Sequence, residues 1–170
     1  ALFAQSLKTF LENYADDIEV AGIAENGKKA VLFAHTLHPD VILMDIYMPE
    51  MNGVDAVREI KSSMPEIKII MLSTYDEDDY VRDALQFGAS GYLLKDISPT
   101  ELIAAIRALR GGVMQISPQI LSKLFNRVFS GEAVNTEALG KKFEWFETLT
   151  KREKEIFGLI ATGADNEAIA

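Results

Sequence analysis

Three polar residues in this sequence have the chemistry needed to act on a phosphoryl group: Asp45, Ser73 and Lys95. Each of them directly follows an apolar run. A carboxylate can act as a nucleophile toward phosphorus and form an acyl phosphate. A hydroxyl can donate a hydrogen bond to a phosphoryl oxygen, and a lysine can offset its charge. Mg²⁺, which takes oxygen ligands, commonly completes such sites.

Each of these residues can also be explained by an ordinary structural role. Asp45 could cap the loop that follows it, Ser73 is of a type common in turns, and Lys95 could be a solvated charge. Tyr92, near Lys95, could be ordinary strand packing. The order and spacing of all four favour a site over these separate explanations.

The elements that would position these residues are strands and helices in alternation. Val41–Met44 is a continuous apolar run, typical of a strand buried on both faces of a parallel sheet. Capping signals at Asn26 and at Ser98–Glu101 mark two helix starts. The predicted strands are 18–23, 41–45, 67–72 and 91–94, and the predicted helices are 2–13, 27–37, 54–63, 76–87 and 99–110.

This alternation predicts an α/β fold, a doubly wound parallel sheet with helices on both faces. Parallel strands end at the same edge, so Asp45, Ser73 and Lys95 should converge there. A flavodoxin-like sheet begins with a strand that pairs on both sides, whereas this chain begins with a helix. We therefore expect that one strand before residue 1 is missing from this sequence.

The alternation of strand and helix patterns ends near residue 112. Ser117-Pro118 starts another helix, and residues 131–142 are polar and typical of a linker. Thr150–Glu153 is a second capping box that opens a helix, and a further helix begins at Asp165. These signals predict a small all-α segment that is incomplete at residue 170.

Composition places the chain among ordinary globular proteins. It has 170 residues, 48% hydrophobic and 25% charged, and no cysteine, so disulfide and thiol chemistry are excluded. No apolar run approaches the roughly 20 residues of a membrane span. The net charge is −9, and nearly all of the acidic excess lies in residues 1–115. The nearly neutral remainder could approach nucleic acid, although an acidic surface also simply favours solubility.

Several motifs together resemble a known family. These motifs are Met44–Pro49 with Gly53, Met71–Thr74, Gly88–Lys95, Leu149–Ile156 and Asn166–Ala170. In this order they resemble a two-component response regulator of the NarL/LuxR (FixJ) type, which joins a receiver domain to a helix-turn-helix output domain. The resemblance implies a receiver domain at 1–112, a helix and linker at 113–145, and the start of the output domain at 146–170.

The resemblance implies a role for each site residue. Asp45 would accept the phosphoryl group, and Asp45 with the Tyr47 backbone carbonyl would bind Mg²⁺. Ser73 would bind the phosphoryl oxygen, and Lys95 would pair with the phosphoryl group or with the carboxylate of Asp45. Tyr92 would be an aromatic switch whose rotamer follows Ser73.

Other implications concern Thr74, the partners and the ends of the chain. Thr74 would border the site and modulate access for water. The partners would be a histidine kinase, double-stranded DNA and, on phosphorylation, a second copy of the chain, all in the cytoplasm and without a membrane. The acidic pair that completes the family's Mg²⁺ site would precede residue 1, and the DNA-reading helix would follow residue 170. The DNA-binding residues are therefore not assigned.

Three other functions share parts of this pattern. An aspartyl-phosphate phosphohydrolase usually pairs its nucleophile with an aspartate two positions on, where this chain has Tyr47. A phosphorylation-independent pseudo-receiver is disfavoured by Asp45, Ser73 and Lys95, but the absent acidic pair leaves it open. A flavodoxin-like cofactor binder lacks its glycine-rich phosphate loop here. We expect a phosphoacceptor rather than an enzyme.

Overall fold

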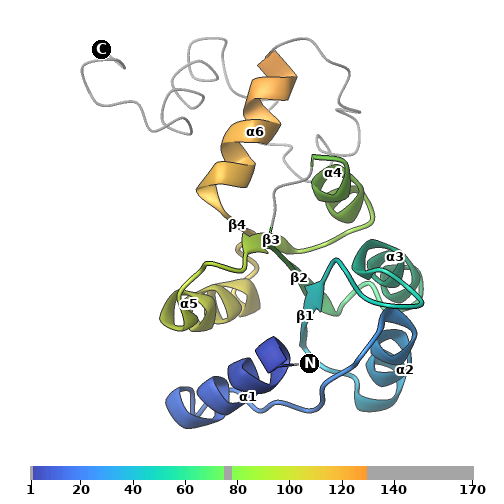
Figure 1. Ribbon diagram of the computed structural model, residues 1–170, viewed down its shortest axis with the longest axis vertical. Helices are drawn as coiled ribbons and strands as arrows, with labels where there is room; N and C mark the ends of the chain where they lie inside the picture. Colours follow the sequence, from blue (N-terminus) through green and yellow to red (C-terminus); the bar gives the residue numbers. More distant parts are fainter. Residues whose placement is uncertain (1, 75–77, 130–170) are drawn as a thin grey trace. The chain divides into compact units, whose positions relative to one another are not determined.

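A computed structural model describes residues 2–74 and 78–129 of the chain, with helices and strands in alternation (Figure 1). The helices are α1 (Leu2–Tyr14), α2 (Gly27–Leu37), α3 (Gly53–Ser63), α4 (Asp78–Gln86), α5 (Pro99–Arg110) and α6 (Pro118–Phe129). The strands are β1 (Val41–Asp45), β2 (Lys68–Ser73), β3 (Gly91–Leu94) and β4 (Gln115–Ile116).

The strands form a four-stranded sheet in the order β1-β2-β3-β4. The pairs β1–β2 and β2–β3 are both parallel, which confirms the predicted parallel sheet. Asp45 lies opposite Leu72, and Ser73 lies opposite Leu94. The ends of β1, β2 and β3 therefore meet at one edge of the sheet.

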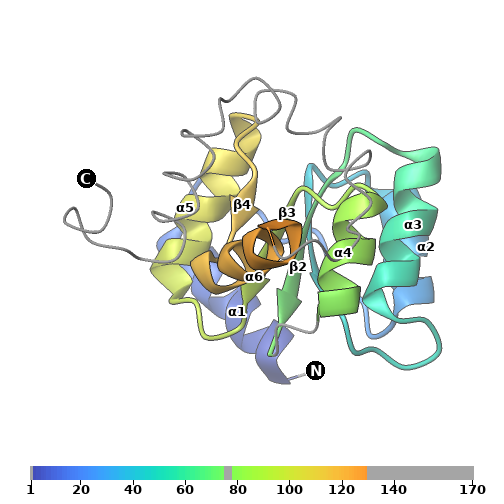
Figure 2. The same cartoon turned by 90° about the horizontal axis from the view of Figure 1, so that it is seen from above.

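Helices cover both faces of this sheet. Figures 1 and 2 show α1 and α5 on one face and α2, α3 and α4 on the other. On the α1–α5 face, Ile70, Leu72 and Leu93 pack with buried residues of the two helices. Because successive strand residues point to opposite faces, Met71 and Tyr92 point to the α3–α4 face, where both are fully buried. The core thus has two layers with the sheet between them.

Capping side chains begin the helices α2, α3 and α5. The Asn26 side chain accepts a hydrogen bond from the backbone N–H of Lys29 at 2.8 Å, and Asn52 accepts one from Asp55 at 2.9 Å. At α5, Ser98 and Glu101 form the predicted reciprocal capping box. Such caps typically contribute about 1 kcal/mol each. They explain why α2 and α5 begin where the sequence predicts.

The strand predicted at 18–23 is wrong. Residues 18–24 have no strand structure, and β1, which the prediction separates from them by the missing first strand, pairs on one side only, with β2. A strand exists through hydrogen bonds to a neighbouring strand, and no described segment supplies them here. Ile18 and Val20 are instead half-buried against the α1–α5 core.

Other differences from the prediction are small. The short β4 was not predicted, and its two residues carry too little pattern to be recognised. β2 extends to Ser73, and α3 begins at Gly53 rather than at residue 54. The predicted linker and the helices expected from residue 150 onward lie outside the described residues.

The chain divides into two compact units, residues 1–115 and 116–170, and α6 belongs to the second. The boundaries predicted near residues 112 and 145 stay predictions. No helix among the described residues is long and apolar enough to cross a membrane.

Candidate functional site

Asp45 is the last residue of β1, at the edge where the parallel strands end. Its Oδ2 accepts a hydrogen bond from Lys95 Nζ at 2.6 Å, and its Oδ1 lies 3.3 Å from the backbone N–H of Tyr47. About a third of the Asp45 side chain is exposed (35%), so one side of the carboxylate faces solvent. The Asp45 carboxylate is therefore held in place and still accessible to a small molecule.

Gly53, the first residue of α3, packs against the end of β1 beside Asp45. Its N–H donates to the carbonyl of Ile46 at 2.8 Å, which closes the loop between β1 and α3. A Cβ atom at position 53 would lie 2.0 Å from the carbonyl oxygen of Asp45. Only a residue without a side chain permits such a close approach to the end of β1.

Lys95 directly follows β3 and is held by its backbone as well as its side chain. Its N–H donates to the carbonyl of Ser73 at 2.7 Å, so the ends of β2 and β3 are joined next to the site. Only 19% of its side chain is exposed. The Lys95 ammonium also lies 5.4 Å from the centre of the Phe3 ring, a cation–π contact that the sequence did not indicate.

Ser73 and Tyr92 are both buried. Ser73 ends β2 at the same sheet edge as Asp45, and only 1% of the residue is exposed. Tyr92 lies opposite Met71 within the sheet and is completely buried, so its ring is inside the core on the α3–α4 side. The structure thus joins Asp45 directly to Lys95, and Lys95 to Ser73 through the backbone, as the topology predicted.

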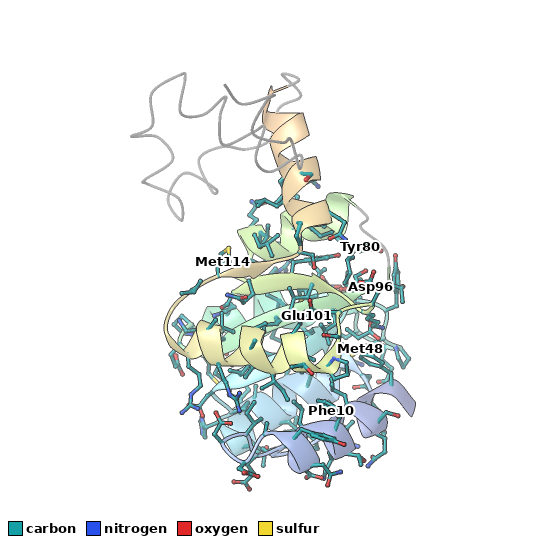
Figure 3. All side chains as sticks on the ribbon, turned by 90° about the vertical axis from the view of Figure 1, so that its left-hand side faces the viewer. Phe10, Met48, Tyr80, Asp96, Glu101 and Met114 are labelled. Carbon is teal, nitrogen blue, oxygen red and sulfur yellow. The ribbon has the colours of Figure 1, made fainter. Side chains whose placement is uncertain are left out.

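Tyr47 and Thr74 are exposed at the rim of the site. The Tyr47 ring is half exposed and meets the ring of Tyr80 edge-on, with the ring centres 5.7 Å apart. In Figure 3, Met48, Tyr80 and Asp96 lie along one edge of the structure. The loop after β1 is therefore in contact with α4, a link that no sequence signal predicted.

The donors available to a metal ion are oxygen atoms. The Asp45 carboxylate, at the end of β1, and the Tyr47 backbone carbonyl, on the loop that follows, come from residues two apart in the chain. Mg²⁺ commonly takes one or two carboxylates and completes its shell with water, so these donors suit it in type. Among the described residues, no three acidic, histidine or cysteine side chains gather closely enough to hold a metal ion. The donors found here supply only part of a Mg²⁺ shell.

Comparison with known proteins gives one consistent result. The response regulator receiver domain family matches residues 1–107. The response regulator protein VraR of Staphylococcus epidermidis is 41% identical over 155 residues, which cover 91% of this chain and 69% of the relative.

Two solved structures show the same similarity. A LuxR-family two-component response regulator from Aurantimonas is 26% identical with a TM-score of 0.65, covering 70% of this chain and 84% of that one. A LuxR-family DNA-binding response regulator from Staphylococcus aureus is 27% identical with a TM-score of 0.60, covering 64% and 89% respectively.

Proposed function

Because the chain belongs to the response regulator receiver family, we propose that it switches transcription when Asp45 accepts a phosphoryl group. The observation that carries this proposal is the pair formed by Asp45 and Lys95, 2.6 Å apart beside the buried Ser73. A nucleophile, a fixed cation and a hydroxyl at one sheet edge are the parts that phosphoryl transfer needs.

In the proposed step, a carboxylate oxygen of Asp45 forms a bond to phosphorus while the bond from phosphorus to the donor breaks. The leaving group departs with that electron pair, and the aspartate becomes an acyl phosphate. Lys95 offsets the added negative charge, and Ser73 donates a hydrogen bond to a phosphoryl oxygen. The donor would be a histidine kinase or a small acyl phosphate.

Mg²⁺ is part of this proposal. The Asp45 carboxylate and the Tyr47 carbonyl would hold it together with water, and the bound ion would supply positive charge beside the phosphoryl oxygens. Labelling by a small phosphodonor should therefore require Mg²⁺ and stop when it is removed with EDTA.

The output would be binding to double-stranded DNA, with a second copy of the chain recruited on phosphorylation. This proposed output is supported by the relatives, which are response regulators. The motifs at 149–156 and 166–170 lie outside the described residues and add no structural support. On phosphorylation, Ser73 would move toward the phosphoryl group, and the side chain of Tyr92 would change rotamer with it. These two changes would alter the surface around α4. Thr74 would border the site at its rim. Two linked output domains would gain affinity for DNA through their shared connection.

The protein is proposed to be a phosphoacceptor and not an enzyme with turnover. The position two residues after Asp45 is Tyr47, so the second carboxylate of a phosphohydrolase is absent there. Sustained release of phosphate from phosphoesters would favour the phosphohydrolase instead. Unchanged DNA binding with and without phosphodonor would favour a pseudo-receiver.

The test compares two aspartates at opposite ends of β1. Asp45→Asn should abolish labelling by acetyl phosphate on a gel that retards phosphorylated protein. Asp40→Asn is the matched control, since Asp40 is exposed and immediately precedes the strand. Equal labelling of the Asp45→Asn variant and the wild type would refute the proposal.

A further inference from the structure

The loop behind Asp45 contains an unusual turn centred on Glu50. The N–H of Met51 donates to the carbonyl of Pro49 at 2.7 Å, a hydrogen bond between residues two apart. Glu50 has φ +64°, in the region that favours glycine. A three-residue turn with positive φ at its centre is rare and strained. Such a conformation persists where the surroundings hold it, often at functional sites.

The Glu50 side chain shows what holds this turn. Its Oε1 accepts a hydrogen bond from Asn26 Nδ2 at 2.8 Å, and its Oε2 lies 3.7 Å from Lys28 Nζ. The lysine contact is exposed and contributes little, so the hydrogen bond to Asn26 matters more. Asn26 uses both ends of its amide, because its Oδ1 also caps α2. The start of α2 is thereby attached to the loop.

The backbones of the two segments also touch. The N–H of Gly27 donates to the carbonyl of Met51 at 3.1 Å. A Cβ atom at position 27 would lie 2.5 Å from that carbonyl oxygen, so glycine is needed for this approach. Two segments separated by more than twenty residues are therefore joined by both backbone and side-chain hydrogen bonds. We call this set the α2 latch: Asn26, Gly27, Lys28, Glu50 and Met51.

We propose that the α2 latch positions the loop that directly follows Asp45 and carries the Tyr47 carbonyl for phosphoryl transfer at Asp45, with Glu50 as the positioning residue. The inference rests on the proposed function of Asp45. Residues 46–53 are tied at their ends by the hydrogen bond between Gly53 and Ile46, and the latch hydrogen-bonds Glu50 and Met51, within the loop, to the start of α2. Small displacements of a reacting group cost large factors in rate, so a firm support for this loop has a kinetic effect.

Four variants separate positioning from folding. Glu50→Gly removes the carboxylate and at the same time relieves the strained φ. Asn26→Asp keeps the α2 cap, since aspartate caps as well as asparagine, but sets a carboxylate against Glu50. The double variant Asn26→Asp with Glu50→Gln reverses donor and acceptor and restores the hydrogen bond. Glu66→Gln, an exposed glutamate on another loop, controls for the loss of one charge.

The readout is the initial rate of labelling by acetyl phosphate with Mg²⁺, measured across donor concentrations, together with the melting temperature. Glu50→Gly and Asn26→Asp should each lower the maximal rate by about three- to tenfold, the effect of one lost hydrogen bond. Relief of the strained φ should offset the lost hydrogen bond in Glu50→Gly, whereas Asn26→Asp should lower the melting temperature by only a few degrees, so that both variants stay folded in the assay. The half-saturating donor concentration should stay unchanged, and the double variant should return the rate to near the wild-type value.

The proposal is overturned if either single variant labels at the rate of Glu66→Gln, if the double variant fails to recover, or if the slower variants are partly unfolded at the assay temperature. Failure of the underlying function gives a different result. In that case the wild type itself is not labelled, or the Asp45→Asn variant is labelled equally, and the latch proposal is overturned with it.

Discussion

The carboxylate of Asp45 is balanced by a single close cation among the described residues, Lys95. The two groups are 2.6 Å apart, and both side chains are partly shielded from solvent. A charge-assisted hydrogen bond in such a setting is about twice as strong as a neutral one. This cation is also the group best placed to meet the negative charge that a phosphoryl group would bring.

We therefore predict that Lys95→Gln slows labelling of Asp45 by at least about tenfold, the loss expected for one charge-assisted hydrogen bond. Initial rates with acetyl phosphate and Mg²⁺ measure the effect. Lys68→Gln is the control, because Lys68 is exposed at the opposite end of the sheet, where β2 begins. Equal rates for the two variants would show that Lys95 has no part in the transfer.

Gly53 approaches the end of β1 too closely to carry a side chain. An alanine Cβ there would lie 2.0 Å from the Asp45 carbonyl oxygen, so the backbone must move. Gly53→Ala should lower the free energy of unfolding by about 1–3 kcal/mol, as overpacking usually does. Urea unfolding measures this, with Gly111→Ala as control. At Gly111 the nearest atom to a new Cβ is 3.3 Å away, so its effect should be clearly smaller.

Among the elements, α5 is tied to the segment after α1 by an ion pair. Arg107 donates two hydrogen bonds to Asp17, at 2.6 and 3.2 Å. The hydrogen bond from Arg107 lowers the pKa of the Asp17 carboxyl below its ordinary value of 3.8. The charged form of Asp17 is thus favoured in the folded state. The contact is exposed, so its contribution to stability is small.

The pH dependence follows from the sign of this shift. A lowered carboxyl pKa stabilises the fold above the unfolded value, and that contribution is lost as the pH falls through the folded value. Asp17→Asn should therefore be less stable than wild type near pH 6, and the difference should shrink as the pH falls below 3.8. Thermal unfolding across this range checks the prediction. A difference that grows in acid would contradict it.

Helix starts were predicted correctly where the residues that determine them are neighbours in the sequence. The caps at Asn26 and at Ser98–Glu101 act within one helical turn, so the sequence contains everything they need. The strand predicted at 18–23 failed because a strand depends on a partner, and partners are set by the whole fold. The strand β4 was missed for another reason, because its two residues carry too little pattern to be recognised.

For the molecule as a whole, topology made the candidate site predictable. Parallel strands end at one edge, so the meeting of Asp45 and Lys95 could be expected from two separate apolar runs. The hydrogen bond between Asn26 and Glu50 could not, because no rule of spacing brings a helix start to that turn. The contact between Tyr47 and Tyr80 escaped prediction for the same reason.

One measurement tests the central claim most directly. The protein is treated with acetyl phosphate and Mg²⁺, any acyl phosphate is reduced with borohydride, and the modified residue is located by peptide mass spectrometry. We predict one modification per chain, at Asp45, and none in protein treated with EDTA. Modification at a different carboxylate, or none at all in the presence of Mg²⁺, would contradict the assignment of Asp45 as the phosphoacceptor.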